Sequence, residues 1–260
     1  MNAHPLKVLV WNVRGLNAQA RRNALYQVVA AANPAIVCLQ ETKLQVVSVI
    51  DVRQCLGNKY ENFFYLPAVG TRGGILVAWD DSITHISNPH YTNHTLTVLV
   101  KCPDDEHAWW LTCVYGLQDE VDKIEFMQDL VDIRDLHVGP WLVAGDFNLL
   151  ARQEDKSNEL VNRRMLRRFR AKLNRLELKE VYLNGRRYTW SNERRNATLE
   201  RIDHFFVSNE WDEAFPTCFL SALGTAISDH CPLILDMNVE ISMRKRFRFE
   251  AFWTKAEGFF

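Results

Sequence analysis

A carboxylate and an amide lie two residues apart near the end of an apolar segment, WLVAGDFNLL, at residues 141–150. The segment is typical of a buried strand, and Asp146 and Asn148 come where that strand should end. A buried carboxylate costs free energy unless it is paired, hydrogen-bonded or bound to a metal ion. We therefore expect other parts of the chain to stabilise Asp146.

Polar residues also lie at the ends of other predicted strands, where each alone fits an ordinary role such as a turn, a cap or a half-buried tyrosine. Those residues are Asn12, Glu41, Tyr115, Asp203, Asp229 and His230. If the sheets bring these strand ends together, the result is a cleft of carboxylates, amides, a tyrosine and a histidine. Oxygen ligands without a thiolate favour Mg²⁺, or Mn²⁺ as a substitute, over zinc.

Short apolar segments predict the strands and helices that would position these residues. Strands are expected at 7–13, 35–40, 73–79, 95–101, 109–115, 141–146, 202–208 and 231–237. Helical periodicity predicts helices at 21–32, 121–135 and 160–177. The first helix lies between the first two strands, and later strands follow one another closely. The expected fold class is mixed α/β (α+β), with two packed mixed β-sheets flanked by helices.

Composition favours one domain in a reducing compartment. The chain has 260 residues, 47% of them hydrophobic, and no repeat or Pro/Gly/Ser-rich linker interrupts residues 6–238. No apolar segment reaches the roughly 20 residues that a membrane-spanning helix needs, and the N-terminus lacks a signal peptide's features. The six cysteines contain no CxxC pair, which argues against a zinc site and suits an intracellular location.

Charge is unevenly distributed along a chain whose net charge is only −1. Residues 161–201 contain 13 Lys and Arg against 4 Asp and Glu, whereas residues 101–160 contain 5 against 14. The basic segment could present a face that attracts phosphates, or it could simply be the solvated side of the helix at 160–177.

Six short motifs in order give the chain a recognisable pattern: WNVRGLN, LQET, VYG, GDFN, RIDHFFVS and SDHCPL. This pattern resembles the endonuclease/exonuclease/phosphatase superfamily from residue 6 to about 238, which implies a DNase I-like four-layer sandwich. WNVRGLN, YGLQDEVDKIEFMQDL and RFRFEAFWTKAEGF look more narrowly like the endonuclease domain of plant non-LTR (LINE-type) retrotransposons. The resemblance implies an endonuclease domain at 1–240 and a basic, aromatic tail at 241–260 that leads towards an absent reverse transcriptase.

The resemblance also implies roles for the residues at the strand ends. Glu41 would be the principal metal ligand, with Asn12 beside it and Asp229 completing the metal neighbourhood. Asp146 would orient or deprotonate the attacking water, and Asn148 would hydrogen-bond the phosphate. His230, held by Asp203, would stabilise the scissile phosphate, and Tyr115 would contact it near the leaving oxygen. On the substrate side the implied residues are Gln118, Thr189 and Trp190, together with Arg194 and Arg195 in the loop that follows.

The resemblance therefore implies Mg²⁺-dependent nicking of double-stranded DNA that leaves a 3′-hydroxyl. In a full-length element, reverse transcriptase and RNA would be partners, and the expected location is the nucleus. The sequence departs from the superfamily pattern at Arg14, because DNA-repair members often carry an acidic residue at that position. The alternatives are an abasic-site nuclease or small-phosphoester phosphatase of the same fold, and a silent copy that binds nucleic acid without cleaving it.

Overall fold

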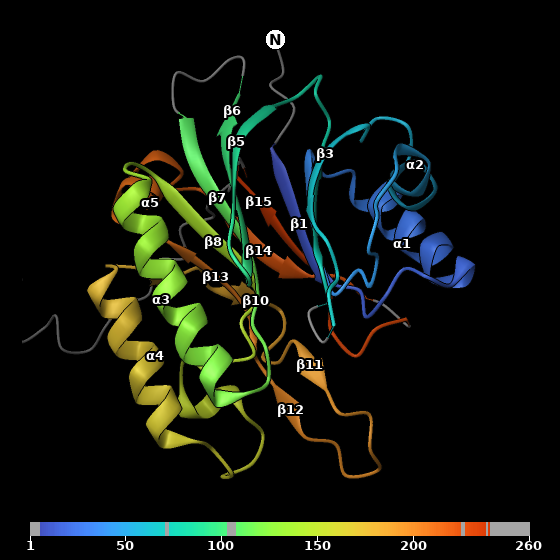
Figure 1. Cartoon of the computed structure of the whole chain (residues 1–260). Helices are drawn as coiled ribbons and strands as arrows, with labels where there is room; N and C mark the ends of the chain where they lie inside the picture. Colours follow the sequence, from blue (N-terminus) through green and yellow to red (C-terminus); the bar gives the residue numbers. More distant parts are fainter. Residues whose placement is uncertain (1–5, 71–72, 103–107, 225–226, 238, 240–260) are drawn as a thin grey trace, which may run out of the picture.

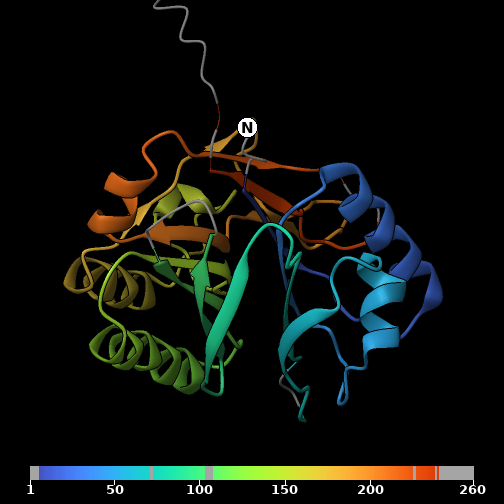
Figure 2. The ribbon, with the colours of Figure 1, turned by 90° about the horizontal axis from the view of Figure 1, so that it is seen from above.

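The computed structural model describes residues 6–70, 73–102, 108–224, 227–237 and 239, so the predicted tail at 241–260 lies outside the described residues. Two β-sheets pack face to face, and helices cover their outer faces (Figures 1 and 2). This arrangement confirms the expected fold class. In the described part of the chain, no helix combines the length and the apolar character needed to cross a membrane.

The first sheet has seven strands in the order β10-β14-β15-β1-β2-β4-β3. Its strands are β1 (Lys7–Asn12), β2 (Ile36–Gln40), β3 (Asn62–Leu66), β4 (Ile75–Trp79), β10 (Leu183–Asn184), β14 (Phe219–Ala222) and β15 (Leu233–Asp236). Helices α1 (Gln19–Ala32) and α2 (Val49–Leu56) cover its outer face (Figure 2).

The second sheet has six strands in the order β5-β6-β7-β8-β13-β9. Its strands are β5 (His85–Tyr91), β6 (Thr95–Lys101), β7 (Ala108–Tyr115), β8 (Trp141–Asp146), β9 (Lys179–Glu180) and β13 (Asp203–Val207). Helices α3 (Glu120–Leu136) and α4 (Arg163–Arg175) cover its outer face, and α5 (Asn209–Ala214) follows β13. A separate hairpin joins β11 (Trp190–Ser191) to β12 (Leu199–Glu200).

Three hydrophobic clusters hold the four layers together, one between each pair of neighbouring layers. The central cluster joins apolar side chains from the facing sides of both sheets, such as Val10 and Cys38 from one and Leu111 and Ala144 from the other. Because side chains alternate along a strand, the opposite faces of the same strands bury Leu9 against α1 and α2, and the other sheet's outer face packs on α3 and α4. Both faces of the central strands are therefore buried.

All eight predicted strands and all three predicted helices are present; the bounds of β6 and β8 are as predicted, and the others are shifted at one or both ends. The helix predicted at 160–177 begins at Arg163, because the side chain of Asn162 accepts a hydrogen bond from the backbone N–H of Met165 and caps it. Helices α2 and α5 and the strands β3, β5, β9–β12 and β14 were not predicted. Most of these strands are very short, and β5 contains Pro89 and a register irregularity between Ser87 and His90.

Strand register brings the predicted polar residues to one edge of the molecule. Asn12 pairs with Gln40 across the parallel strands β1 and β2, so Glu41 follows at the same end. Tyr115 pairs with Asp146 across the parallel strands β7 and β8, and Asp146 pairs with Asp203 across β8 and β13. The edge is fixed by backbone pairing of the strands rather than by loops.

Gly116 lets the chains that leave β7 and β8 run in contact. Its backbone N–H donates to the carbonyl oxygen of Asp146, 2.7 Å away. A Cβ at this position would collide with the backbone carbonyl of Phe147. The absence of a side chain at Gly116 therefore keeps Asp146 and Asn148 in place.

Gly116→Ala should lower the free energy of unfolding by about 2–3 kcal/mol, the scale of overpacking in a rigid region. Denaturant unfolding of the variant and the wild type measures the change. Gly224→Ala is the matched control, because no described atom lies within 4 Å of a Cβ built there and its φ is not positive. Equal losses in the two variants would contradict the explanation.

Candidate active site

The carboxylate of Asp146 lies at the centre of the edge and is 1% exposed. Its Oδ2 accepts hydrogen bonds from Asn12 Nδ2 at 2.9 Å and Asn148 Nδ2 at 3.2 Å, and its Oδ1 accepts from the backbone N–H of Asn148 at 2.9 Å. Asn148 adopts a left-handed φ of +48°, which folds its amide back over Asp146. Burial raises the pKa of Asp146, and the nearby charge of His230 opposes that rise.

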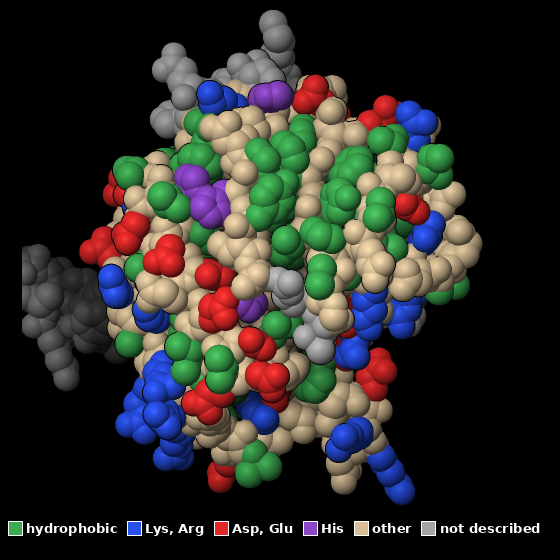
Figure 3. All heavy atoms as spheres, viewed as in Figure 1, with side chains coloured by type: hydrophobic (Ala, Val, Ile, Leu, Met, Phe, Trp, Pro, Cys, Tyr) green, Lys and Arg blue, Asp and Glu red, His purple; other side chains and the backbone are tan. Residues whose placement is uncertain are grey.

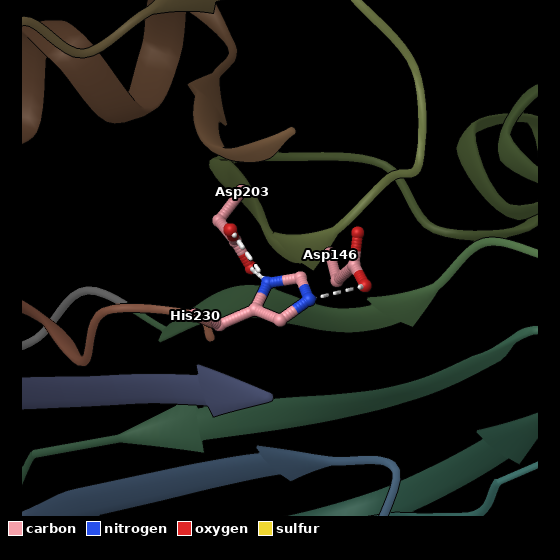
Figure 4. A group of neighbouring side chains, drawn as sticks. All are labelled: Asp146, Asp203 and His230. Carbon is pink, nitrogen blue, oxygen red and sulfur yellow. Dashed lines mark hydrogen bonds and ion pairs between the residues drawn. The ribbon is translucent and has the colours of Figure 1, made fainter. Parts of the chain in front are cut away.

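His230 lies between two carboxylates (Figure 4). Its Nδ1 is 2.9 Å from Oδ2 and 3.1 Å from Oδ1 of Asp203, and its Nε2 is 3.8 Å from Oδ2 of Asp146. Since a carboxylate only accepts hydrogen bonds, Nδ1 carries a proton. Burial lowers the pKa of His230, but Asp203 and Asp146 outweigh burial and raise that pKa to about 9. The imidazole is therefore a cation at neutral pH, held in one orientation.

Two buried side chains position this pair. The hydroxyl of Thr189, which is 0% exposed, accepts hydrogen bonds from the backbone N–H groups of Ile202 at 3.2 Å and Asp203 at 3.1 Å. The indole of Trp11 donates to the backbone carbonyl of His230 at 3.1 Å. Thr189 therefore fixes the start of β13 through these two hydrogen bonds. Its side chain is buried and does not line an open surface.

Arg14 bridges Glu41 and Asp229, and Lys43 contacts Glu41. The guanidinium of Arg14 donates to Asp229 Oδ2, and its Nε is 4.0 Å from Glu41 Oε1. Lys43 Nζ is 3.1 Å from the same oxygen of Glu41. Trp190 Nε1 donates to Asp229 Oδ2 at 2.8 Å, while Asp229 Oδ1 is buried and has no hydrogen-bond partner among the described residues. Arg14 thus lies beside two carboxylates that the family resemblance implies as metal ligands.

Most of the predicted site residues line one cleft of about 490 Å³, namely Asn12, Glu41, Tyr115, Gln118, Asp146, Asn148, Trp190 and His230. Asp203, Asp229 and Thr189 lie behind this wall and hold it. The cleft therefore has a mainly polar wall with amide, carboxylate, imidazole and phenol groups together.

Tyr115 and Gln118 lie on the β7 side of this cleft. Burial, followed by the charges of Glu41 and Asp146, raises the pKa of the Tyr115 phenol, which therefore keeps its proton and can donate a hydrogen bond. Gln118 Nε2 donates to Asn148 Oδ1 at 2.9 Å. Both groups can thus donate towards an anion that enters the cleft.

Arg194 and Arg195 are exposed in the turn between β11 and β12 and do not line the cleft. The structure adds cleft residues that the sequence did not indicate, chiefly Lys123 and Lys156. No sequence signal distinguishes these two lysines from ordinary charged residues, because only tertiary packing places them at the cleft: Lys123 on α3, and Lys156 through its bridge to Glu200.

Thr189→Val should lower the free energy of unfolding by about 1–3 kcal/mol, because it leaves two backbone N–H groups without their acceptor. Thr189→Ser is the matched control: it keeps the hydroxyl and should cost about 1 kcal/mol or less for the lost methyl group. Thermal or denaturant unfolding measures both variants. If serine proved as damaging as valine, the hydroxyl would not be what holds β13.

Comparison with known proteins agrees with this geometry. Residues 9–230 match the Endonuclease/Exonuclease/phosphatase family. The exodeoxyribonuclease of Bacillus subtilis (strain 168) is 25% identical over 262 residues, which cover 90% of this chain and 100% of that protein. These matches support a hydrolytic reaction of the nuclease and phosphatase type.

Solved structures show the same fold. The endonuclease domain of TRAS1, a telomere-specific non-LTR retrotransposon, superposes with a TM-score of 0.69 at 16% identity, covering 90% of this chain and 99% of that one. The AP endonuclease LMAP from Leishmania major superposes with a TM-score of 0.67 at 22% identity, covering 90% of this chain and 88% of the other. Because the family match extends over most of its length, this protein belongs to the Endonuclease/Exonuclease/phosphatase family.

Proposed function

We propose that this chain is a Mg²⁺-dependent endonuclease of the retrotransposon type, which nicks double-stranded DNA and leaves a 3′-hydroxyl. The observation that supports this proposal best is the set of groups around Asp146. Asn12, Asn148 and the cationic His230 all approach one buried carboxylate at the wall of an open cleft. A phosphodiester hydrolase needs a proton acceptor, phosphate ligands and fixed geometry, and this set can supply all three.

Each residue has a role that its surroundings suit. Asp146, whose pKa burial raises, accepts a proton from the attacking water more readily than an exposed carboxylate would. His230 binds a phosphate oxygen through Nε2, since Asp203 holds Nδ1. Asn148 Nδ2 donates to Gly116 and Asp146 in the unbound site, and it would exchange one of these hydrogen bonds for one to the same phosphate as negative charge develops. The neutral phenol of Tyr115 would donate near the leaving oxygen.

The residues present fit a divalent cation. Glu41, Asn12 and Asp229 would hold it, because they offer oxygen ligands and Asp229 Oδ1 is buried without a hydrogen-bond partner among the described residues. When bound, the ion would neutralise charge that develops on the phosphate. Asp146, Asp203 and His230 also place potential ligand atoms within 4.8 Å of one another. We assign that group to acid–base work instead, because Asp203 holds Nδ1 of His230 and leaves Nε2 for the phosphate.

DNA is the proposed partner. Figure 3 shows Lys and Arg side chains gathered over α4, where five arginines and one lysine occur between residues 163 and 172. The exposed Arg194 and Arg195, with Trp190 at the base of their hairpin, would contact DNA beyond the scissile phosphate. Within a longer element, residues 1–240 would act as the nuclease domain in the nucleus, beside a reverse transcriptase and its RNA.

A supercoiled-plasmid assay tests the proposal. With Mg²⁺ the full chain should convert supercoiled DNA to open circles, EDTA should stop the conversion, and a DNA polymerase should extend the nicks without prior phosphatase treatment. Cleavage confined to DNA with abasic sites would instead indicate the repair-type nuclease, and release of terminal or small-molecule phosphate without nicking would indicate the phosphatase. DNA binding without any hydrolysis would indicate a silent copy.

In this assay Asp203→Asn and His230→Ala should each slow nicking by about 10²–10³-fold, the scale of losing a preorganised charged group. Because Asp203 acts by holding His230, the double variant should lose far less than the product of the single losses. His85→Ala, whose side chain is 66% exposed, is the control and should nick normally. Multiplicative losses would show that the two residues act independently.

Arg14→Gln should strengthen binding of a divalent ion about five- to tenfold, because it removes a positive charge that contacts Asp229 and approaches Glu41. Calorimetric titration with Mn²⁺ in the absence of DNA measures the affinity. Arg53→Gln, which breaks a remote surface pair with Glu61, is the matched control. Glu41→Gln should remove most of the binding, and an unchanged affinity in Arg14→Gln would contradict the assignment of Glu41 and Asp229 as ligands.

A further inference from the structure

Lys123 is a half-buried cation without an ion-pair partner. It lies in the first turns of α3 and lines the active-site cleft with Asp146 and Asn148. Within the described ranges of the chain, no carboxylate oxygen lies within 4 Å of its ammonium group. The other lysine of the cleft, Lys156, differs because its Nζ is 2.7 Å from Glu200 Oε1.

Burial of the Lys123 ammonium group costs free energy that its contacts within the protein do not offset. Burial lowers the pKa of Lys123, and Glu200 and Asp146 act in the opposite direction from beyond ion-pair distance. A lysine that served only the fold would gain from a direct partner or from full exposure of its ammonium group. An anion bound in the cleft would supply the missing partner.

The space beside Lys123 continues away from the catalytic residues. A second hollow of about 240 Å³ shares Gln118, Lys123, Asn148, Lys156 and Glu200 with the cleft, and it extends past Glu120 to Asn162 at the start of α4. Figure 1 shows the two helices side by side, with their N-terminal ends at this edge of the molecule. The first turn of α4 contains no acidic residue, so its positive dipole end is not neutralised from within the helix.

We propose that Lys123 binds the phosphate adjacent to the scissile one, and that this DNA strand leaves the cleft through the hollow towards the N-terminus of α4. This inference rests on the proposed function, because it takes the phosphate near His230 and Asn148 as the one that is cleaved. Gln118, which already contacts Asn148, lines both the cleft and the hollow. The hollow reaches Asn162, the N-cap of α4, and basic side chains gather over this helix (Figure 3).

Binding measured in EDTA separates this subsite from catalysis. Fluorescence anisotropy with a short labelled duplex gives the affinity of the full chain at several salt concentrations. Lys123→Gln should bind about tenfold more weakly, the scale of one charge-assisted hydrogen bond. Its plot of log affinity against log salt should be shallower by about 0.9, the value for one lost phosphate contact. Lys101→Gln, with the same charge change, is the matched control at the opposite end of the second sheet and should behave like the wild type.

A neutral methylphosphonate at single positions of the duplex locates the contact. One substitution next to the nick should weaken binding to the wild type but add nothing to the loss in Lys123→Gln. Coupling at that position supports the subsite. Equal affinity and equal salt slope in Lys123→Gln and the wild type would overturn it, as would additive losses at every position.

Thermal unfolding excludes a purely structural role. Removing an unpaired, half-buried charge should leave the melting temperature of Lys123→Gln equal to or above that of the wild type. Weaker binding together with a lower melting temperature would overturn the subsite, because the loss would then reflect a damaged fold. A wild-type chain that binds DNA but does not nick would contradict the proposed function, while the salt slope would still decide the subsite.

Discussion

The burial of Asp146 is the constraint on which the rest of the site depends. A carboxylate that is 1% exposed is tolerable only where several donors face it, and the donors come from three parts of the chain. Asn12 ends β1, Asn148 follows β8 in a left-handed conformation, and His230 precedes β15. Their convergence requires both sheets to end at the same edge, so the packing of the two sheets and the chemistry of the site have a common cause.

Charge compensation then sets what each carboxylate can do. Asp203 is engaged by His230, and Asp229 by Arg14 and Trp190, which leaves Asp146 with a contact of only 3.8 Å to the imidazole. The carboxylate with the weakest cationic partner is thus the one best able to accept a proton. Placement alone, rather than residue type, therefore gives these aspartates different abilities to accept a proton.

The sequence predicted the central strands because both faces of each are buried and the segments are continuously apolar, as in β2 and β8. It predicted the strand-end residues because polar side chains lie at the ends of such segments, where a buried charge costs free energy unless it is paired, hydrogen-bonded or bound to a metal ion. It did not predict β9–β12 or α5, which are short and owe their conformation to neighbours rather than to local pattern. The role of Thr189 in holding Asp203, the bridge that Arg14 makes and the position of Lys123 all depend on contacts between distant segments, which no local spacing reveals.

The cations around the cleft are not equivalent, and their differences suggest how an anionic substrate approaches. Arg14 and Lys43 contact Asp229 and Glu41, so their charges are largely neutralised before any substrate arrives. Lys123 has no such direct partner, and the arginines of α4 lie on a helix whose first turn lacks acidic residues. Positive charge is therefore concentrated on the α4 side of the cleft, because α3 itself contains six acidic residues and only two basic ones. The proposed DNA substrate, entering from that side, would meet attractive charge first and reach Asp146 last.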